Sequence, residues 1–262
     1  MNINDITITS LETITAFDML GKYLFTLDEL QNATIANTQD TEDITGKQGR
    51  KLAKLKRNKA VTISGTNGLL SGGLLEMQTG SAFANEATLV MHTDYLTISS
   101  NAATTSYKAV GTSGAEIIDV AIRNADGTQG VVLTQAASAK KDENFAYAPG
   151  TKALTFAGLE DGTEIIVHYE RKIQASVLTN ESDVYSGKCQ LYIDALAEDK
   201  CANVYHVQFF VPKADFSGEF SIEMGDNQTV HAFEAEALAG ACGAGGNLWT
   251  YTVYGANAAD VA

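Results

Sequence analysis

Residues 205–211, Tyr-His-Val-Gln-Phe-Phe-Val, decide the fold class of this chain. Apolar residues occupy every second position from Tyr205 to Val211, and the polar residues His206 and Gln208 lie between them. A period of two is typical of a strand with one buried and one solvated face, as in antiparallel sheets. The same alternation recurs at 23–27, 61–63, 165–169, 191–193, 220–224 and 249–253. The sequence therefore predicts a mostly β protein.

Turns and one short helix complete the expected secondary structure. Asp-Gly pairs at 126–127 and 161–162 are typical of tight hairpins. The best helical pattern is short and covers Phe233–Ala241. The glycine-rich stretch at 240–246 follows this helix and lacks the Lys-Ser/Thr of a phosphate-binding loop, so we expect a turn that leads into the strand at Trp249.

The length of 262 residues allows one large domain or two modest ones. The composition shifts near residues 85 and 172: the part between them is rich in Ala, Thr and Ser, whereas the flanks hold most of the aromatic residues. We expect a discontinuous domain formed by residues 1–84 and 173–262. Residues 85–172 are then an inserted small β-sandwich of immunoglobulin-like type.

The segment Asn37–Lys59 departs from the alternating pattern. Its first part is acidic, and its second part holds seven of the 18 lysines and arginines of the chain. A structureless loop of this length is uncommon inside a compact domain and is generally functional or disordered. We expect an extended loop between two early strands, near 22–35 and 60–66.

Three interpretations of this basic segment are open. It could contact nucleic acid through phosphates, but it has no aromatic residue for base stacking, and the net charge of −14 opposes such a partner. It could bind the acidic surface of an identical neighbour, a head-to-tail contact that produces rings or open stacks. It could also be a solvated flexible loop.

Catalytic, cofactor and metal-binding patterns give no positive signal. The HExxH, Walker and GxSxG motifs are absent, and the four histidines share no spacing. A zinc site built from cysteines and His206 or His231 is disfavoured, because the cysteines are too far apart in sequence. We expect no enzyme activity, no cofactor and no metal, and we expect the three cysteines to pack as small apolar side chains: Cys189, Cys201 and Cys242.

The first twenty residues lack the basic start and the unbroken apolar stretch of a secretory leader. No other part of the chain approaches the roughly 20 apolar residues that a membrane-spanning helix requires. We therefore expect a protein that is made in a cytoplasm and has no membrane partner.

Three stretches of the flanking parts stand out together: Thr45–Arg50 in the basic segment, Val211–Phe220, and residues 225–251. They resemble major tail tube proteins of long-tailed bacteriophages, over about two thirds of the chain. The resemblance implies an antiparallel β-sandwich or barrel subunit with one short helix. Such subunits form sixfold rings, join their sheets into an inner β-barrel, and stack into a hollow tube.

The resemblance also implies roles for particular residues. Residues 39–59 would be the loop that stacks one ring onto the next. Its implied contact residues are Asp40, Glu42, Asp43, Lys47, Arg50, Lys51, Leu52, Lys54, Leu55, Lys56 and Arg57. The polar strand faces would line a channel whose negative wall repels DNA and lets it pass without specific binding. The implied lumen-facing residues are Asp194, Gln208, Glu219 and Glu223.

The implied partners are other copies of the chain in stacked hexameric rings, and other tail proteins: baseplate or tip, terminator and tape measure. The implied location is the virion tail, after assembly in the host cytoplasm. The alternative is a capsid decoration or host-surface-binding β-sandwich, in which residues 85–172 bind a host glycan or another virion protein.

Overall fold

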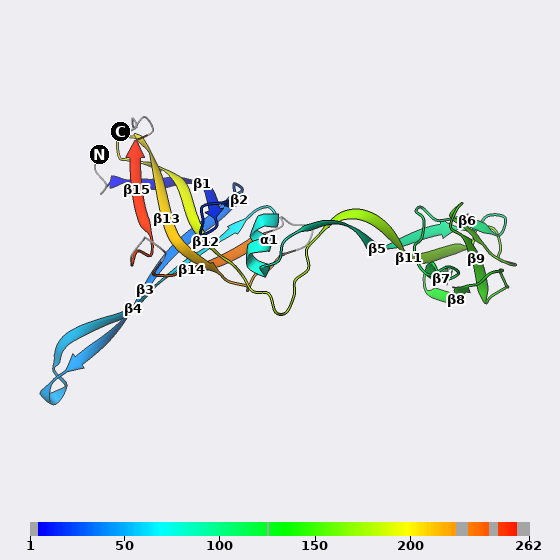
Figure 1. Ribbon diagram of the computed structural model, residues 1–262, viewed down its shortest axis with the longest axis horizontal. Coiled ribbons are helices and arrows are strands. Elements are labelled where there is room, and N and C mark those ends of the chain that lie inside the picture. Colours follow the sequence, from blue (N-terminus) through cyan, green and yellow to red (C-terminus); the bar gives the residue numbers. More distant parts are fainter. Residues whose placement is uncertain (1–4, 125, 224–229, 241–245, 256–262) are drawn as a thin grey trace. The chain divides into compact units, whose positions relative to one another are not determined.

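The alternating stretch at 205–211 lies within strand β13 (Val204–Phe216), at the centre of a sheet that organises the first part of the protein. The structure is a computed structural model, and it describes residues 5–124, 126–223, 230–240 and 246–255. Strands make up most of the described chain (Figure 1), which confirms the predicted mostly β class. The chain divides into two compact units, Met1–Phe83 with Leu178–Ala262 and Ala84–Val177.

The first unit contains an eight-stranded sheet in which every pairing is antiparallel. Its other strands are β1 (Thr7–Phe17), β2 (Tyr23–Leu27), β3 (Leu30–Thr45), β4 (Lys51–Asn67), β12 (Lys188–Glu198), β14 (His231–Ala237) and β15 (Thr250–Gly255). The order across the sheet is β2-β1-β12-β13-β14-β4-β3, and β15 pairs with β13. The sheet curls so that β1 contacts β3.

The core of the first unit lies on the inner face of this curled sheet. Ile14, Ile63 and Leu191 are completely buried there, because each takes the inward position of an alternating strand. Burying such a side chain contributes about 1.5–3 kcal/mol. Cys189 lies in the same core, and burial raises the pKa of its thiol to about 12, so this cysteine packs as an apolar side chain.

The short helix of the described chain is α1 (Gly72–Thr79), which contacts β2. The hydroxyl of Ser71 accepts a hydrogen bond from the Leu74 amide at 3.4 Å, and Gly80 ends the helix in the left-handed conformation with φ 75°. Leu74 is completely buried in the core. No helix in the described part of the chain is long and apolar enough to cross a membrane.

The helix expected at Phe233–Ala241 is wrong. Its described part is mostly the strand β14, in which Phe233, Ala235 and Ala237 are buried at every second position. The glycine-rich turn expected after it lies largely outside the described residues. The local sequence of this segment favours neither a helix nor a strand. The segment is a strand because β14 pairs with both β4 and β13.

The strand expected at 220–224 is also wrong in its described part. Phe220 and Ile222 lie outside the strands, and Ile222 forms only an isolated bridge with His231. Met224 lies outside the described residues. The strand expected near 22–35 is divided by a turn into β2 and β3.

The second unit has a seven-stranded sheet with its own core. Its strands are β5 (Ala84–Thr97), β6 (Ala102–Thr104), β7 (Ile117–Arg123), β8 (Gln129–Gln135), β9 (Asn144–Ala148), β10 (Ala153–Thr155) and β11 (Glu164–Val177). The order is β5-β11-β7-β8-β9-β10-β6, and β8 and β9 are parallel whereas the other pairs are antiparallel. Ala84 and Val177, its first and last residues, are paired directly.

Candidate assembly surfaces

The basic segment is a β-hairpin, not an irregular loop. Strands β3 and β4 stay paired from their base to Thr45 and Lys51, and a tight 3-10 turn at Lys47–Gly49 closes the hairpin. In Figure 1 this hairpin extends away from the sheet of the first unit. The expectation of an extended loop between two separate strands is therefore wrong. The acidic part of the segment pairs with its basic part, and this pairing extends β3 and β4 toward the tip.

A bulge separates the base of this hairpin from its tip. The pairing passes from Thr38–Ala60 to Asp40–Arg57, which leaves one extra residue on β4. Asn58 takes the left-handed conformation there with φ 48°, and its side-chain amide donates to Asp40 Oδ2 at 3.0 Å. We define the tip as residues 40–57, all of which are exposed except Gly46.

The acidic residues of the tip find partners inside the hairpin. Glu42 pairs with Arg57 at 2.9 Å, and Asp43 pairs with Lys51. Because both pairs are exposed, each is worth only about 0.2–1 kcal/mol. The remaining cations of the hairpin form no ion pair within the described part of the chain: Lys47, Arg50, Lys54, Lys56 and Lys59.

The two faces of the tip differ in chemistry. Ile44 lies opposite Ala53 and is a diagonal neighbour of Leu55, so these side chains share one face. Ile44 is 47% exposed and Leu55 37%. Lys54 and Lys56 alternate with them and lie on the other face. The face with Ile44, Ala53 and Leu55, here called the apolar face, also carries the paired Glu42 and Arg57, and the face with Lys54 and Lys56 is here called the basic face.

Charge is distributed very unevenly between this hairpin and the rest of the chain. Residues 39–59 contain three acidic and seven basic residues, a net charge of +4. Since the whole chain carries −14, the remainder carries −18. A cationic projection on a strongly acidic chain favours contact between copies of the same protein.

A four-stranded patch of the sheet, formed by β1, β12, β13 and β15, has two free edges. Within the described residues, Thr7–Thr13 of β1 and the whole of β15 have no strand on their outer sides. The two edges lie at the same height along the strands. Thr13 pairs with Asp194, Asp194 with Gln208, and Gln208 with Thr252 on successive strands. Three antiparallel steps separate β1 from β15, so these edges run in opposite directions.

The four residues in register across the patch, Thr13, Asp194, Gln208 and Thr252, form a polar row on the face opposite the core. Gln208 Nε2 donates to Asp194 Oδ1 at 2.8 Å, and Thr13 Oγ1 donates to Asp194 Oδ2 at 3.5 Å. The structure thus brings together two of the four residues expected on a channel wall. Glu219 and Glu223 are exposed but follow β13, outside this patch.

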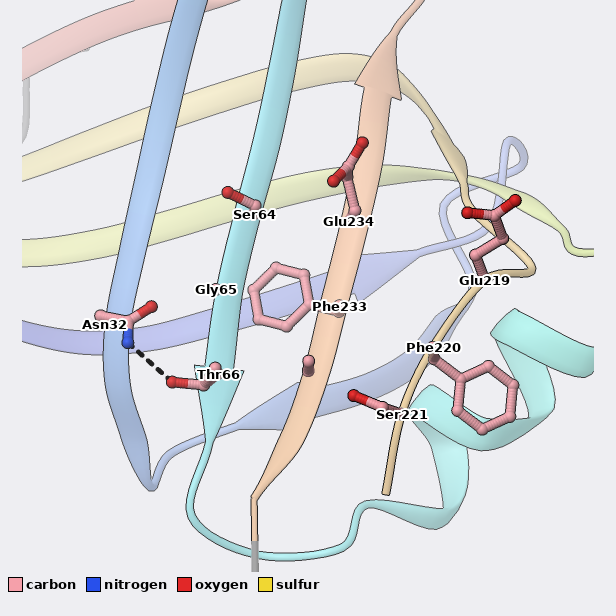
Figure 2. A pocket seen from close by; sticks show the side chains of 10 residues that line it. Asn32, Ser64, Gly65, Thr66, Glu219, Phe220, Ser221, Phe233 and Glu234 are labelled. Carbon is pink, nitrogen blue, oxygen red and sulfur yellow. Dashed lines mark hydrogen bonds between the residues drawn. The ribbon is translucent and has the colours of Figure 1, made fainter. Parts of the chain in front are cut away.

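Glu219 instead lies at a shallow pocket of about 490 Å³ beside β4 and β14. Figure 2 shows the Phe233 ring next to Gly65, with Glu219 and Phe220 on the other side of β14. Serine and glutamate side chains line the pocket, but no histidine, cysteine or lysine is among its described lining residues. Among these described residues, no hydrogen bond joins a serine hydroxyl to a glutamate carboxylate.

An apolar groove of about 410 Å³ opens on the inner side of the curled sheet. The Trp249 indole N–H donates to Asn37 Oδ1 at 3.4 Å across it. Its main apolar lining residues are Ile8, Leu11, Ile35, Ile193, Phe209 and Trp249. No sequence pattern predicted this groove, because its residues come from five separate segments and no local pattern connects them.

His231 takes part in hydrogen bonds that connect parts of the fold. His231 is buried, accepts from the Ser71 amide at 3.4 Å through Nδ1, and lies 2.8 Å from Gln78 Oε1 through Nε2. Burial lowers the pKa of His231. The described residues contain no cluster of histidine, cysteine and carboxylate side chains that could hold a metal. Cys201 is exposed in a turn, and Cys242 lies outside the described residues.

A hydrogen-bonded carboxylate inside the second unit is also structural. Burial alone would raise the pKa of Asp94, but hydrogen bonds from Ser106, Tyr169 and His92 outweigh it and lower that pKa. Burial in turn raises the pKa of Tyr169 to about 12. The Tyr169 hydroxyl donates to Asp94 Oδ2 at 2.8 Å. This network connects β5 to β11 and to the loop that follows β6.

Residues 6–250 match the model of the YomU/Tube protein family. The chain belongs to the YomU/Tube protein family, whose name indicates a phage tube-like structural protein. No curated protein matches the sequence.

Proposed function

We propose that this protein is the structural subunit of a phage tail tube. Six copies close into a ring, rings stack head to tail, and the hollow tube is a passive conduit for DNA during ejection. The proposal gives the protein no catalytic role. The observation that carries it is the pair of free, oppositely directed edges on the four-stranded patch.

Ring closure follows from the direction of these edges. When β1 of a second copy lies beside β15, the antiparallel alternation of the patch continues without interruption. A closed ring also removes the unpaired N–H and C=O groups that otherwise promote uncontrolled pairing. Six patches of four strands then form one continuous inner barrel.

Stacking of the rings is assigned to the β3–β4 hairpin. The tip has unpaired cations within the described chain, and the rest of the protein carries a net charge of −18. A head-to-tail contact of this kind repeats indefinitely because each copy offers both halves of it. The stacking residues expected from the sequence all lie on this tip.

The channel wall is assigned to the outer face of the patch. Its other face is buried in the core, so only the face with Asp194 and Gln208 is available. The row that contains them holds one carboxylate and no cation. Such a wall repels DNA over a distance of about 10 Å at 0.1 M salt and does not hold it.

The second unit, Ala84–Val177, is proposed to be an added surface module of a virion tail protein. Its own core supports independent packing. The first unit is proposed to contact copies of itself and the other tail proteins: baseplate or tip, terminator and tape measure. Assembly would take place in the host cytoplasm.

A proline at the edge strand tests ring closure. Thr250 is the first residue of β15, a position where a strand tolerates proline, so Thr250→Pro should fold. It should fail to form rings or tubes in negative-stain electron microscopy of the concentrated protein. Thr250→Val keeps the N–H group and should assemble as the wild type does. Tubes formed by the proline variant would contradict closure through β15.

Deletion of the second unit separates the tube from the alternative function. Because Ala84 and Val177 are paired, a short turn can replace the residues between them. The shortened protein should still form tubes. If the wild type binds capsids or host cells without forming tubes, and the deletion abolishes that binding, the decoration or host-binding protein is the better assignment.

A further inference from the structure

We propose that the apolar face of the hairpin tip inserts into the apolar groove of a second copy. Ile44 and Leu55 are the inserted side chains, and Ile8 and Trp249 lie in the receiving groove. This inference rests on the proposed tube function and deepens it. It names the surface that receives the hairpin, which the charges alone do not determine.

The tip presents apolar surface that nothing covers within the described chain. Leu52 is 64% exposed, Ile44 47% and Leu55 37%, and the last two share one face. The base of the same hairpin shows the contrast, since Val61 and Ile63 are completely buried. Apolar side chains gathered on one face of a projecting hairpin are typical of a surface that is buried on association.

The groove has the size and chemistry to receive these side chains. Its mouth includes Ile8, which is half exposed, and its deeper part includes Ile193, which is 3% exposed. An apolar cavity of about 150 Å³ holds a benzene-sized group. The groove, at about 410 Å³, therefore has room for two aliphatic side chains.

The hairpin cannot fill its own groove. Asn37 lines the groove, and Ile44 lies seven residues further along the same strand. At about 3.3 Å per residue, these seven residues place Ile44 some 23 Å away. Pairing of β3 with β4 on both sides of the bulge prevents the tip from folding back. The tip of the same chain is therefore excluded as the occupant, whereas the tip of a second copy has no such restriction.

Charge supports the same occupant. Residues 39–59 carry a net charge of +4, whereas the rest of the chain carries −18. Glu12 and Glu198 neighbour groove residues in sequence or register but lie on the opposite face of the sheet, so they do not surround the groove. The opposite net charges of the hairpin and the remainder favour encounter of the tip with another copy.

Disulfide trapping between two full-length variants tests the docking. One protein carries Ile8→Cys and the other Leu55→Cys, both with Cys201→Ser and Cys242→Ser, while Cys189 stays buried. After mixing and oxidation, a disulfide-linked dimer that contains one of each should be the main product. Ile8 and Leu55 are exposed enough that neither change should alter the fold, which circular dichroism checks.

The matched control is Lys56→Cys, one residue away but on the opposite face of the hairpin. A disulfide requires Cα atoms within about 7 Å and converging Cβ directions, so this variant should trap little or no mixed dimer. Electron microscopy of the same mixtures records whether tubes form.

The outcomes separate the docking from the tube function. Tubes without the Ile8–Leu55 cross-link, or equal trapping by Lys56→Cys, would overturn the docking and leave the tube intact. The cross-link without tubes would support the docking and count against the tube. Absence of both would overturn both.

Discussion

The base and the tip of the β3–β4 hairpin belong to the same two strands, yet they differ in almost every physical respect. At the base, Val61 and Ile63 alternate with solvated residues and are completely buried. Beyond the bulge at Asn58, both faces of the ribbon are exposed. An isolated two-stranded ribbon is at best marginally stable in water, so the tip depends on the base for its order.

This difference teaches where stability and assembly reside. Substitutions at the base should change the free energy of unfolding, whereas substitutions at the tip should change assembly and leave the subunit folded. The predictions that follow start with the largest expected effect.

Neutralising the tip should abolish tube formation. The variant Lys47→Gln, Arg50→Gln, Lys54→Gln and Lys56→Gln removes four exposed cations that have no ion pair in the described chain. Thermal unfolding should be unchanged, because these side chains contribute nothing to the core. The readouts are electron microscopy and sedimentation.

The control for that variant removes the same charge from the second unit. Its four exposed lysines, changed to glutamine, are Lys108, Lys140, Lys141 and Lys172. Tubes should form in this control. Loss of tubes in both variants would show that net charge, and not the tip, governs stacking.

Truncation of a base residue should unfold the subunit before it affects assembly. Ile63→Ala leaves a cavity in the core and should lower the free energy of unfolding by about 2–5 kcal/mol. The same type of truncation at the tip, Ile44→Ala, should cost less than about 0.5 kcal/mol. Urea unfolding measures both values, and similar losses would contradict the distinction between base and tip.

Gly65→Ala should destabilise the base by overpacking. A Cβ at this position would lie 2.5 Å from the Asn32 carbonyl oxygen and 2.7 Å from the Phe233 ring. Forced shifts of this kind cost about 1–3 kcal/mol. Ser64→Ala, next to it on the opposite face, is the matched control and should unfold as the wild type does.

The base should also weaken in mild acid through His231, which pairs with Asn67 at the end of β4. Burial lowers the pKa of His231, so the unfolded chain binds its proton more readily than the folded chain. Stability should therefore fall as the pH drops below about 6.5, with a slope of at most about 1.4 kcal/mol per pH unit. His231→Gln should reduce this slope. An unchanged slope would show that protonation of carboxylates, and not of His231, causes the loss of stability.

The first strand shows why part of the fold escaped the sequence analysis. Ile8, Leu11 and Ile14 all face inward along β1, but two bulges set them three residues apart. A spacing of three disguises a strand that would otherwise show period two. The helix α1 was missed for a different reason: its first two residues are glycines, and only Ser71 and Gly80 mark its ends.

The candidate surfaces divide in a similar way. The position of the basic segment could be read directly, because seven cations within thirteen residues are a local property. Its hairpin structure could not, since Glu42–Arg57 and Asp43–Lys51 pair only when the register of β3 and β4 is known. Asp194 and Gln208 were expected on one surface, and the register brings them into contact, whereas Glu219 lies elsewhere.

The sequence by itself determined the mostly β class and the cationic projection, because alternation and charge clustering act between neighbouring residues. The tertiary structure alone decided the two free edges, the polar row and the apolar groove. These depend on long-range pairing: Ile8 and Ile193 line one groove although they are far apart in the chain. Burial of a shared core selects that pairing, and no local segment contains the information.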